Sequence, residues 1–439
     1  MQFRASIERE EGAIPPPLLS TVHPNDFAQC AIREKISEPM KILIYTQPFA
    51  PIVGGAERYV MLLAEGLSAL GGSGTVEITV VTPTPADNFD DSKLAFRVVR
   101  KPNLRVLLNL IWNADVIQLV GPCFLPLLAA RLLGKPVVVE HHGYPPVCPN
   151  GLLFHEPSKS VCPGYFRARR YGECLRCNAN NGGWFNSLRM LLLTFPRRWL
   201  CQHVAANTPI TVHVEKRLEL PRSQVIYYGI PDAPLDAQSQ AVSPLRRSPL
   251  CFAYVGRLVS LKGLPLILEA AKSLQKEGYS FRLKFVGDGP KQAELKWQAE
   301  KLGLLQHVEF TGFITGPAFQ LAMNDVAAVL MPSVWEETAG LAAIEQMMRG
   351  RLVIASDIGG LGEVVDGCGL RFPAGSAEAL AQCMRTVLDR PEIIVENGNL
   401  ARRRALDVFS QRRMVKEHFD LYCQLVPSLD GGRKAQHLT

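Results

Sequence analysis

Short apolar runs alternate with amphipathic segments along most of the chain. Runs rich in valine, isoleucine and leucine are typical of strands that are covered on both faces, and they therefore predict parallel sheets. In the first half the predicted strands are residues 41–46, 76–83, 96–102, 114–121, 136–143, 203–207 and 224–230. Residues 56–71, between the first two strands, carry apolar side chains at helical spacing.

The same alternation starts again after a polar segment. Residues 233–249 are rich in proline, serine and glutamine, which predicts a linker. Further strands are predicted beyond it, at residues 251–256, 281–287, 307–312, 326–332 and 351–356. The pattern indicates an α/β protein with two Rossmann-like lobes facing a central cleft.

The predicted lobes are residues 40–232 and 250–410. We expect residues 411–425 to form a C-terminal helix that returns to the first lobe, and residues 426–439 to form a flexible tail. Residues 1–39 are polar and contain three consecutive prolines, so they are either a disordered extension or a mis-assigned start.

Composition and charge narrow the class of protein. The chain is 47% hydrophobic and 20% charged, as expected for a globular protein. A net charge of +7 favours anionic partners, and nucleic acid is disfavoured because no basic stripe is interleaved with aromatic residues. No secretory signal and no apolar run of about 18 residues is present, so we expect a cytoplasmic protein, with peripheral contact to the inner membrane face as a further expectation.

Candidate chemistry gathers in the loops after the strands of the second half. Arg257 and Lys262 follow the first of these strands, and Gly287 follows the second. Ligands of parallel sheets bind beyond the carboxyl ends of the strands. Because arginine and lysine neutralise phosphates and glycine permits close backbone approach, these loops predict a site for a phosphate-bearing ligand.

The stretch SVWEETAGLAAIEQMMRG, residues 333–350, carries two glutamates around a predicted helix start at Thr338-Ala339-Gly340. The free N–H groups of a helix start favour an anion. Glu337 lies just outside and can accept hydrogen bonds from sugar hydroxyls, while Glu345 lies eight residues on, at most about 12 Å along a helix axis. This separation suits the hexose and the ribose of a nucleotide sugar. The alternative is an amphipathic helix with two solvated acids.

Several segments together resemble the retaining glycosyltransferases of family 4, also called group 1, whose fold is of the GT-B type. The spacing Glu337-x7-Glu345 resembles the family's E-x7-E signature. Other segments that match in order are GGAERYVMLLAEGL, VGRLVSLKG, FVGDGP and GGLGEVV. The resemblance extends from about Met40 to Tyr422.

The resemblance implies roles for individual residues. Arg257 and Lys262 would hold the donor diphosphate, Glu345 the ribose, and Glu337 the transferred sugar. Further donor contacts are implied for the backbone of Gly287, Ala339, Gly340 and Leu341 and for the first glycine loop, Gly54 and Gly55. His142 matches the family's histidine in the acceptor cleft, and His141 is the alternative because adjacent strand residues point to opposite faces.

Two departures from the family pattern affect these expectations. Thr338-Ala339-Gly340 replaces the frequent Pro-Phe-Gly after the first glutamate, which puts sugar selectivity in doubt. Tyr228-Gly229 replaces the usual Asn-Gly before the linker, which puts any contact made by that asparagine in doubt.

The function implied is transfer of a hexose from a UDP- or GDP-sugar to a glycan or lipid-linked acceptor, with retention of anomeric configuration, in the synthesis of a cell-surface polysaccharide or glycoconjugate. No Asp-x-Asp motif follows the strands, so metal-independent catalysis is expected. The alternatives are a nucleotide-sugar epimerase or phosphorylase on the same fold, or a non-catalytic nucleotide-sugar binder.

The segment 186–200 is either a helix packed in the first lobe or an amphipathic helix lying on an acidic membrane.

Four of the eleven cysteines fall within an insertion of irregular composition, residues 144–200. They are Cys148, Cys162, Cys174 and Cys177. A structural zinc site is one candidate role, because four thiolates complete a tetrahedral site and can supply folding free energy. An iron–sulfur cluster, two disulfides or four free thiols are the alternatives that the sequence leaves open.

Overall fold

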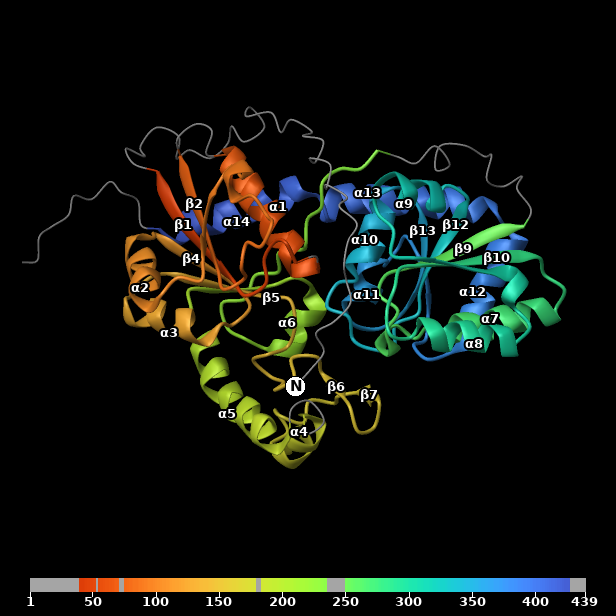
Figure 1. Cartoon of the computed structure of the whole chain (residues 1–439), viewed down its shortest axis with the longest axis horizontal. Helices are drawn as coiled ribbons and strands as arrows, with labels where there is room; N and C mark the ends of the chain where they lie inside the picture. The colour runs from red at the N-terminus through yellow and green to blue at the C-terminus, as the bar shows by residue number, and fades with distance from the viewer. Residues whose placement is uncertain (1–38, 53, 71–74, 179–182, 235–248, 427–439) are drawn as a thin grey trace, which may run out of the picture.

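The computed structural model describes residues 39–52, 54–70, 75–178, 183–234 and 249–426. The chain forms two lobes that lie side by side, each with a central sheet covered by helices (Figure 1). The expectations for residues 1–39 and 426–439, and for most of the linker, concern residues that lie outside the described ranges, apart from Pro39 and Val426.

The first lobe contains a six-stranded parallel sheet in the order β3-β2-β1-β4-β5-β8. Its strands are β1 (Met40–Thr46), β2 (Val76–Thr82), β3 (Arg97–Arg100), β4 (Val116–Val120), β5 (Val137–His141) and β8 (Ala206–Pro209). All five residues of β4 and of β5 are buried, which explains their continuous apolar runs. The helices of this lobe are α1 (Gly55–Leu70), α2 (Leu104–Asn113), α3 (Phe124–Leu132) and α6 (Val212–Leu218).

The second lobe repeats this arrangement, with the sheet order β11-β10-β9-β12-β13-β14. Its strands are β9 (Leu250–Val255), β10 (Phe281–Val286), β11 (Val308–Gly312), β12 (Val326–Met331), β13 (Leu352–Ser356) and β14 (Leu370–Phe372). The helices are α7 (Pro265–Lys276), α8 (Gln292–Lys301), α9 (Gly316–Met323), α10 (Leu341–Met348), α11 (Gly359–Val364), α12 (Ala377–Asp389) and α13 (Glu392–Val408). Both sheets therefore have the doubly wound order, and the prediction of two Rossmann-like lobes is confirmed.

The last helix, α14 (Gln411–Leu425), leaves the second lobe and packs against α1 of the first. The contact is close, because a Cβ added to Gly66 of α1 would lie 2.3 Å from Val415. Tyr59 Oη of α1 and His418 Nε2 of α14 lie 3.0 Å apart, and both residues are buried. The chain thus crosses between the lobes a second time at residues 409–411.

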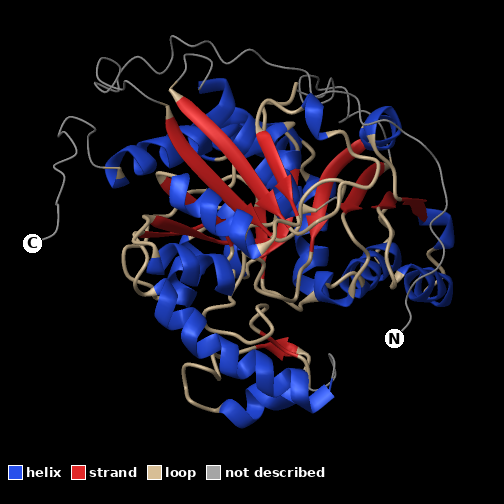
Figure 2. Cartoon of the chain, turned by 60° about the vertical axis from the view of Figure 1, so that its left-hand side comes forward, coloured by secondary structure: helices blue, strands red, loops and turns tan. Residues whose placement is uncertain are grey.

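The insertion between β5 and β8 projects from the first lobe, away from both sheets (Figures 1 and 2). It contains a small hairpin, β6 (Phe154–His155) and β7 (Ser160–Val161), and two packed helices, α4 (Tyr171–Asn178) and α5 (Gly183–Cys201). The insertion is therefore more regular than its composition indicates. No helix in the described ranges combines the length and the apolar character needed to cross a membrane.

The predicted strand at residues 224–230 is wrong. This segment forms no strand: isolated bridges lie just before the segment and at its end, Asn207 with Ser223 and Ile230 with Ser410. The N–H groups of Gln224 and Ile226 donate to the β8 carbonyls of Asn207 and Pro209 at 2.9 and 3.1 Å. Its tyrosines are covered by other parts of the chain, since Tyr228 donates to the Gly55 carbonyl at 3.1 Å and Tyr227 donates to Glu363 at 2.6 Å. The apolar pattern reflects burial between the lobes and not membership of a sheet.

Candidate active site

Glycine turns bring the strand ends of the second lobe together. Gly287 follows β10 with a φ of +138°, and a Cβ there would lie 2.1 Å from the Gly256 carbonyl oxygen. A Cβ on Gly289 would lie 2.5 Å from the carbonyl oxygen of Leu258. Only glycine permits these backbones to approach so closely. The loop that carries Arg257 and Lys262 is therefore held against the loop after β10.

Lys262 and Glu337 form an ion pair at this rim. Lys262 Nζ lies 2.8 Å from Glu337 Oε2, and the Glu337 side chain is only 5% exposed. Ser333 donates a hydrogen bond to the other carboxylate oxygen of Glu337. The close approach depends on Gly263, whose φ is +63° and where a Cβ would lie 2.0 Å from the Pro332 carbonyl oxygen. Arg257 lies on the same loop as Lys262, and its side chain is exposed.

Helix α10 begins at Leu341, three residues later than the sequence predicts. Gly340 takes a left-handed conformation, with φ +73°, and acts as the residue before the helix. The turn before it packs on the start of α11, because a Cβ on Gly360 would lie 2.1 Å from the Thr338 carbonyl oxygen. Ala339 is buried, so its expected contact with a donor can come only from the backbone.

Glu345 contacts the first lobe. It forms an ion pair with Arg58 of α1, and the Glu345 side chain is 27% exposed. Gly55, at the start of α1, faces the same helix, since a Cβ there would lie 3.6 Å from Leu341. Gly54 and Gly55 are therefore brought close to the N-terminus of α10 from the opposite lobe, whereas Arg58 was not identified from the sequence.

The two histidines of the first lobe have different surroundings. His141 is buried, and its Nε2 lies 2.9 Å from Asn207 Oδ1. Burial lowers the pKa of His141 to about 4. His142 has a side chain that is 19% exposed, and its Nε2 lies 3.3 Å from the fully buried carboxylate of Glu140. Of the two, His142 is the residue with access to a ligand, with Glu140 and the ring of Tyr59 orienting its imidazole.

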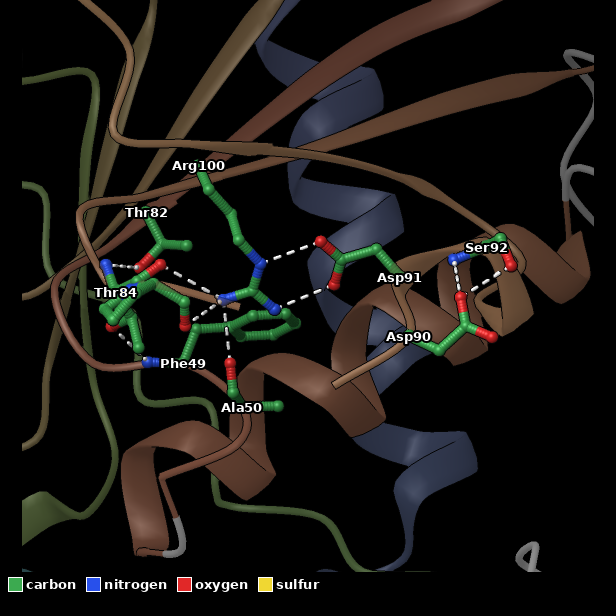
Figure 3. A network of polar contacts seen from close by, with 9 residues as sticks. Phe49, Ala50, Thr82, Thr84, Asp90, Asp91, Ser92 and Arg100 are labelled. Carbon is green, nitrogen blue, oxygen red and sulfur yellow. Dashed lines mark hydrogen bonds and ion pairs between the residues drawn. The ribbon is translucent and has the colours of Figure 1, made fainter. Parts of the chain in front are cut away.

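Arg100, at the end of β3, fixes the loop that leads into the first glycine turn (Figure 3). Its guanidinium forms two hydrogen bonds of 2.7 Å with the Asp91 carboxylate and donates to the carbonyl of Ala50 at 2.8 Å. Thr84 adds a contact to this loop by accepting a hydrogen bond from the Phe49 N–H at 3.1 Å. The loop before Gly54 is therefore attached to the sheet at several points.

Two glutamates that the sequence analysis did not single out connect the lobes beside the site. Glu336 accepts a hydrogen bond from Arg217 Nε at 3.1 Å, and its carbonyl accepts one from Tyr144 at 3.2 Å. Glu363 accepts hydrogen bonds from the N–H groups of Val212 and His213 at the start of α6. Their positions in the sequence, Glu336 directly before Glu337 and Glu363 within GGLGEVV, could have marked both as candidates. Their hydrogen-bond partners are distant in sequence, so the contacts between the lobes could not have been predicted.

The predicted metal ligands lie elsewhere. Cys148, Cys162, Cys174 and Cys177 are all in the insertion, and each is a buried thiol without a disulfide partner. The structure thus brings together Lys262, Glu337, Glu345, Gly55 and the start of α10, with Arg257 on the same rim, and it separates the cysteines from them.

Comparison with known proteins identifies the family of this chain. Residues 53–233 match the sequence model described as Glycosyltransferase Family 4, and residues 237–404 match the one described as Glycosyl transferases group 1. A 2-deoxystreptamine glucosyltransferase of Streptomyces kanamyceticus is 27% identical over 68% of this chain and 74% of its own. An alpha-D-kanosaminyltransferase of the same organism is 30% identical over 62% of this chain and 66% of its own.

Solved structures show the same fold. HepE of Anabaena, crystallised with UDP, superimposes with a TM-score of 0.65 at 17% identity, over 88% of this chain and 100% of its own. The two sequence models match consecutive parts of the chain, one for each lobe, and the strand order of both sheets agrees with the shared architecture. The chain therefore belongs to the group 1 glycosyltransferases and has the GT-B fold.

Proposed function

We propose that the protein transfers a hexose from a UDP- or GDP-sugar to an acceptor hydroxyl, with retention of anomeric configuration and without a metal ion. The observation that carries this proposal is the Lys262–Glu337 pair, with Arg257 beside it, at the start of α10. It combines cations for a diphosphate with a buried carboxylate for sugar hydroxyls. UDP in HepE and the glycosyltransferase relatives support a nucleotide-sugar donor.

In the proposed reaction the bond between the anomeric carbon and the phosphate oxygen breaks, and a bond from the acceptor oxygen to the same face of that carbon forms. The acceptor proton passes to the departing phosphate oxygen. Lys262, Arg257 and the N–H groups at the start of α10 would stabilise the negative charge of the nucleoside diphosphate. These fixed cations would take the part that a metal ion plays in other transferases.

The other residues position the two substrates. Glu345 would hold the ribose, which requires its ion pair with Arg58 to open or to share the carboxylate. His142, oriented by Glu140, would contact the sugar or the acceptor from the first lobe. Because Glu345 and Gly55 come from opposite lobes, approach of the lobes would enclose the donor and exclude water.

The test is incubation of the full chain with a panel of UDP- and GDP-sugars, with and without candidate acceptors and chelator. A glycosylated product whose anomeric configuration by NMR equals that of the donor is the expected outcome. Conversion of the nucleotide sugar to its epimer without an acceptor would indicate an epimerase. Cleavage that depends on phosphate would indicate a phosphorylase, and binding without turnover would indicate a non-catalytic binding protein. Loss of activity with chelator would contradict metal independence.

We further propose that the acceptor is lipid-linked and presented at an acidic membrane, because α5 exposes an aromatic and apolar stripe. Phe185 is 88% exposed, Trp199 55% and Leu192 58%, and the spacing places them along one side of the helix. Arg189 lies within the same stripe and is exposed. Aromatic rings with adjacent arginines suit an interface of anionic headgroups.

After sedimentation with phosphatidylglycerol vesicles, the protein should be found in the pellet. A smaller fraction of the protein should pellet with neutral phosphatidylcholine vesicles. A Phe185→Ser, Trp199→Ser double variant should lose this binding. Trp297→Ser is the matched control, since Trp297 on α8 of the second lobe is 58% exposed. Absence of vesicle binding, or self-association through α5 in analytical ultracentrifugation, would contradict the membrane contact while leaving the proposed reaction intact.

A further inference from the structure

Four cysteines of the insertion surround one small cavity. Cys148 follows β5, Cys162 follows β7, and Cys174 and Cys177 lie one turn apart on α4. Each is at most 7% exposed. They line, with Asn150 and His155, a cavity that leaves about 10 Å³ for the centre of a water-sized sphere. This space is large enough for a single ion or water molecule and too small for an organic ligand.

Two N–H groups point at Cys177 Sγ, which also lies 3.3 Å from the Phe154 carbonyl oxygen. The side-chain amide of Asn150 donates to Cys177 Sγ at 3.2 Å, and the Glu156 N–H donates at 3.4 Å. A neutral thiol is a weak acceptor, whereas N–H donors around a ligand stabilise its charged form. Asn150 Oδ1 also lies 2.9 Å from Cys148 Sγ, so one amide connects two of the four sulfur atoms.

The insertion has little apolar material of its own. Within the described residues, the buried cluster that belongs to the insertion alone consists of Phe166, Cys174 and Leu191, while Val147 and Leu153 join the core of the first lobe. Three separate segments of the insertion nevertheless converge at the cysteines. A structural metal can supply folding free energy to such a segment.

Across the described ranges, no three His, Cys, Asp or Glu side chains are already arranged to hold a metal ion. No disulfide joins the four cysteines either. The sulfur atoms therefore share a cavity without forming a coordination sphere. Ligation would require their side chains to turn toward the centre of this cavity.

We propose that Cys148, Cys162, Cys174 and Cys177 ligate a single Zn²⁺ ion, which the small cavity between them has room for. Binding of Zn²⁺ replaces four S–H bonds with four S–Zn bonds, releases four protons and changes no oxidation state. The proposal does not depend on the reaction proposed above.

The centre would support the loop that carries Glu337. Trp335 Nε1, in the second lobe, donates to the Leu152 carbonyl at 2.5 Å, and Leu152 lies between the first two ligands. Arg217 donates to the Cys162 carbonyl at 2.7 Å and to the Glu336 carboxylate at 3.1 Å. If the metal fixes the backbone around Leu152 and Cys162, these hydrogen bonds would position the residues directly before Glu337.

The experiment is metal analysis by inductively coupled plasma mass spectrometry on the full chain purified without chelator. About one zinc per chain is expected. About four iron atoms per chain with visible absorption would instead show a cluster and overturn the zinc assignment. Cys174→Ser and Cys177→Ser should each lose the metal. Cys383→Ser is the matched control, since Cys383 is a half-buried thiol on α12 of the second lobe.

Less than roughly 0.2 metal equivalents per chain, with the four thiols titratable in the native protein, would overturn the proposal. Retention of metal in both cysteine variants, or two disulfides found by mass spectrometry, would overturn it equally. If a serine variant does not fold, the wild-type protein still decides, because a mercurial reagent should release the metal in step with modification of four thiols. Limited proteolysis of metal-free protein should cut within residues 144–200 and leave the second lobe intact.

Discussion

The ammonium group of Lys262 lies 2.8 Å from the carboxylate of Glu337, although the two residues follow different strands, β9 and β12. Glu337 is almost fully buried, and Ser333 satisfies its other oxygen. Each residue thus holds the other in place, and the pair presents a positive and a negative group side by side at one rim of the second lobe.

Lys262→Ala should lower turnover with the preferred donor by at least about tenfold, because a charged hydrogen bond contributes roughly 1.5–3 kcal/mol. The melting temperature should also fall, since Glu337 would remain buried without its cation. Steady-state kinetics and thermal unfolding measure the two effects. Lys276→Ala, at an exposed lysine on α7, is the control and should change neither. Wild-type kinetics in Lys262→Ala would show that the site assignment is wrong.

Glu345→Ala and Arg58→Ala should change donor affinity in opposite directions. Loss of the carboxylate should weaken UDP binding by about tenfold or more, because a charged hydrogen bond to the ribose is lost. Loss of Arg58 frees the carboxylate and should tighten binding by up to about fivefold, as expected for an exposed ion pair worth about 0–1 kcal/mol. Isothermal titration with UDP measures both. Weaker binding in Arg58→Ala would instead indicate that the guanidinium contacts the donor.

His141 should make the folded state sensitive to mild acid. Burial lowers its pKa to about 4, whereas the unfolded chain takes up this proton near the ordinary value of 6.5. Because the unfolded chain binds this proton more readily, the free energy of unfolding is highest above about pH 6.5. It decreases as the pH falls toward 4, by up to roughly 1.4 kcal/mol per pH unit. Urea unfolding between pH 7.5 and pH 5 measures this slope. His141→Gln should reduce it, with the remainder coming from His418, whose pKa burial also lowers, while His203→Gln, at an exposed histidine, should follow the wild type.

Gly360→Ala should destabilise the protein by about 1–3 kcal/mol, because the new Cβ would lie 2.1 Å from the Thr338 carbonyl oxygen and displace the turn before α10. The measurement is denaturant unfolding, together with UDP affinity. Gly172→Ala is the matched control, since no atom lies within 4 Å of its added Cβ and Gly172 lies in helix α4. That variant should be unchanged or slightly more stable. Equal stability of the two variants would contradict the packing argument.

The sequence predicted the features that depend on local pattern. Strands such as residues 116–120 and 326–331 are buried on both faces, so their continuous apolar runs were sufficient to predict them as strands of a parallel sheet. The E-x7-E spacing located Glu337 and Glu345 for a similar reason, because both lie within one short segment.

Features that depend on contacts between the lobes were missed. The tyrosines of residues 224–230 have the apolar pattern of a strand, but Tyr228 is buried and Tyr227 half-buried through contacts with Gly55 and Glu363. The ion pair of Arg58 and Glu345 joins residues that are 287 positions apart, and no local pattern identifies such a partner. The helix start at residue 341 differs from the prediction because Gly340 takes a left-handed conformation that its neighbours Thr338 and Ala339 do not reveal.

The return of α14 to α1 has a consequence for synthesis on the ribosome. The surface of α1 around Gly66 is completed by Val415, which is made about 350 residues later. At a typical rate of about 5–20 residues per second, roughly 20–70 seconds separate the two. During that interval the face of α1 around Gly66 has no partner, so the first lobe cannot complete its packing until residue 415 has been made, and chaperones that bind apolar surface have time to engage it.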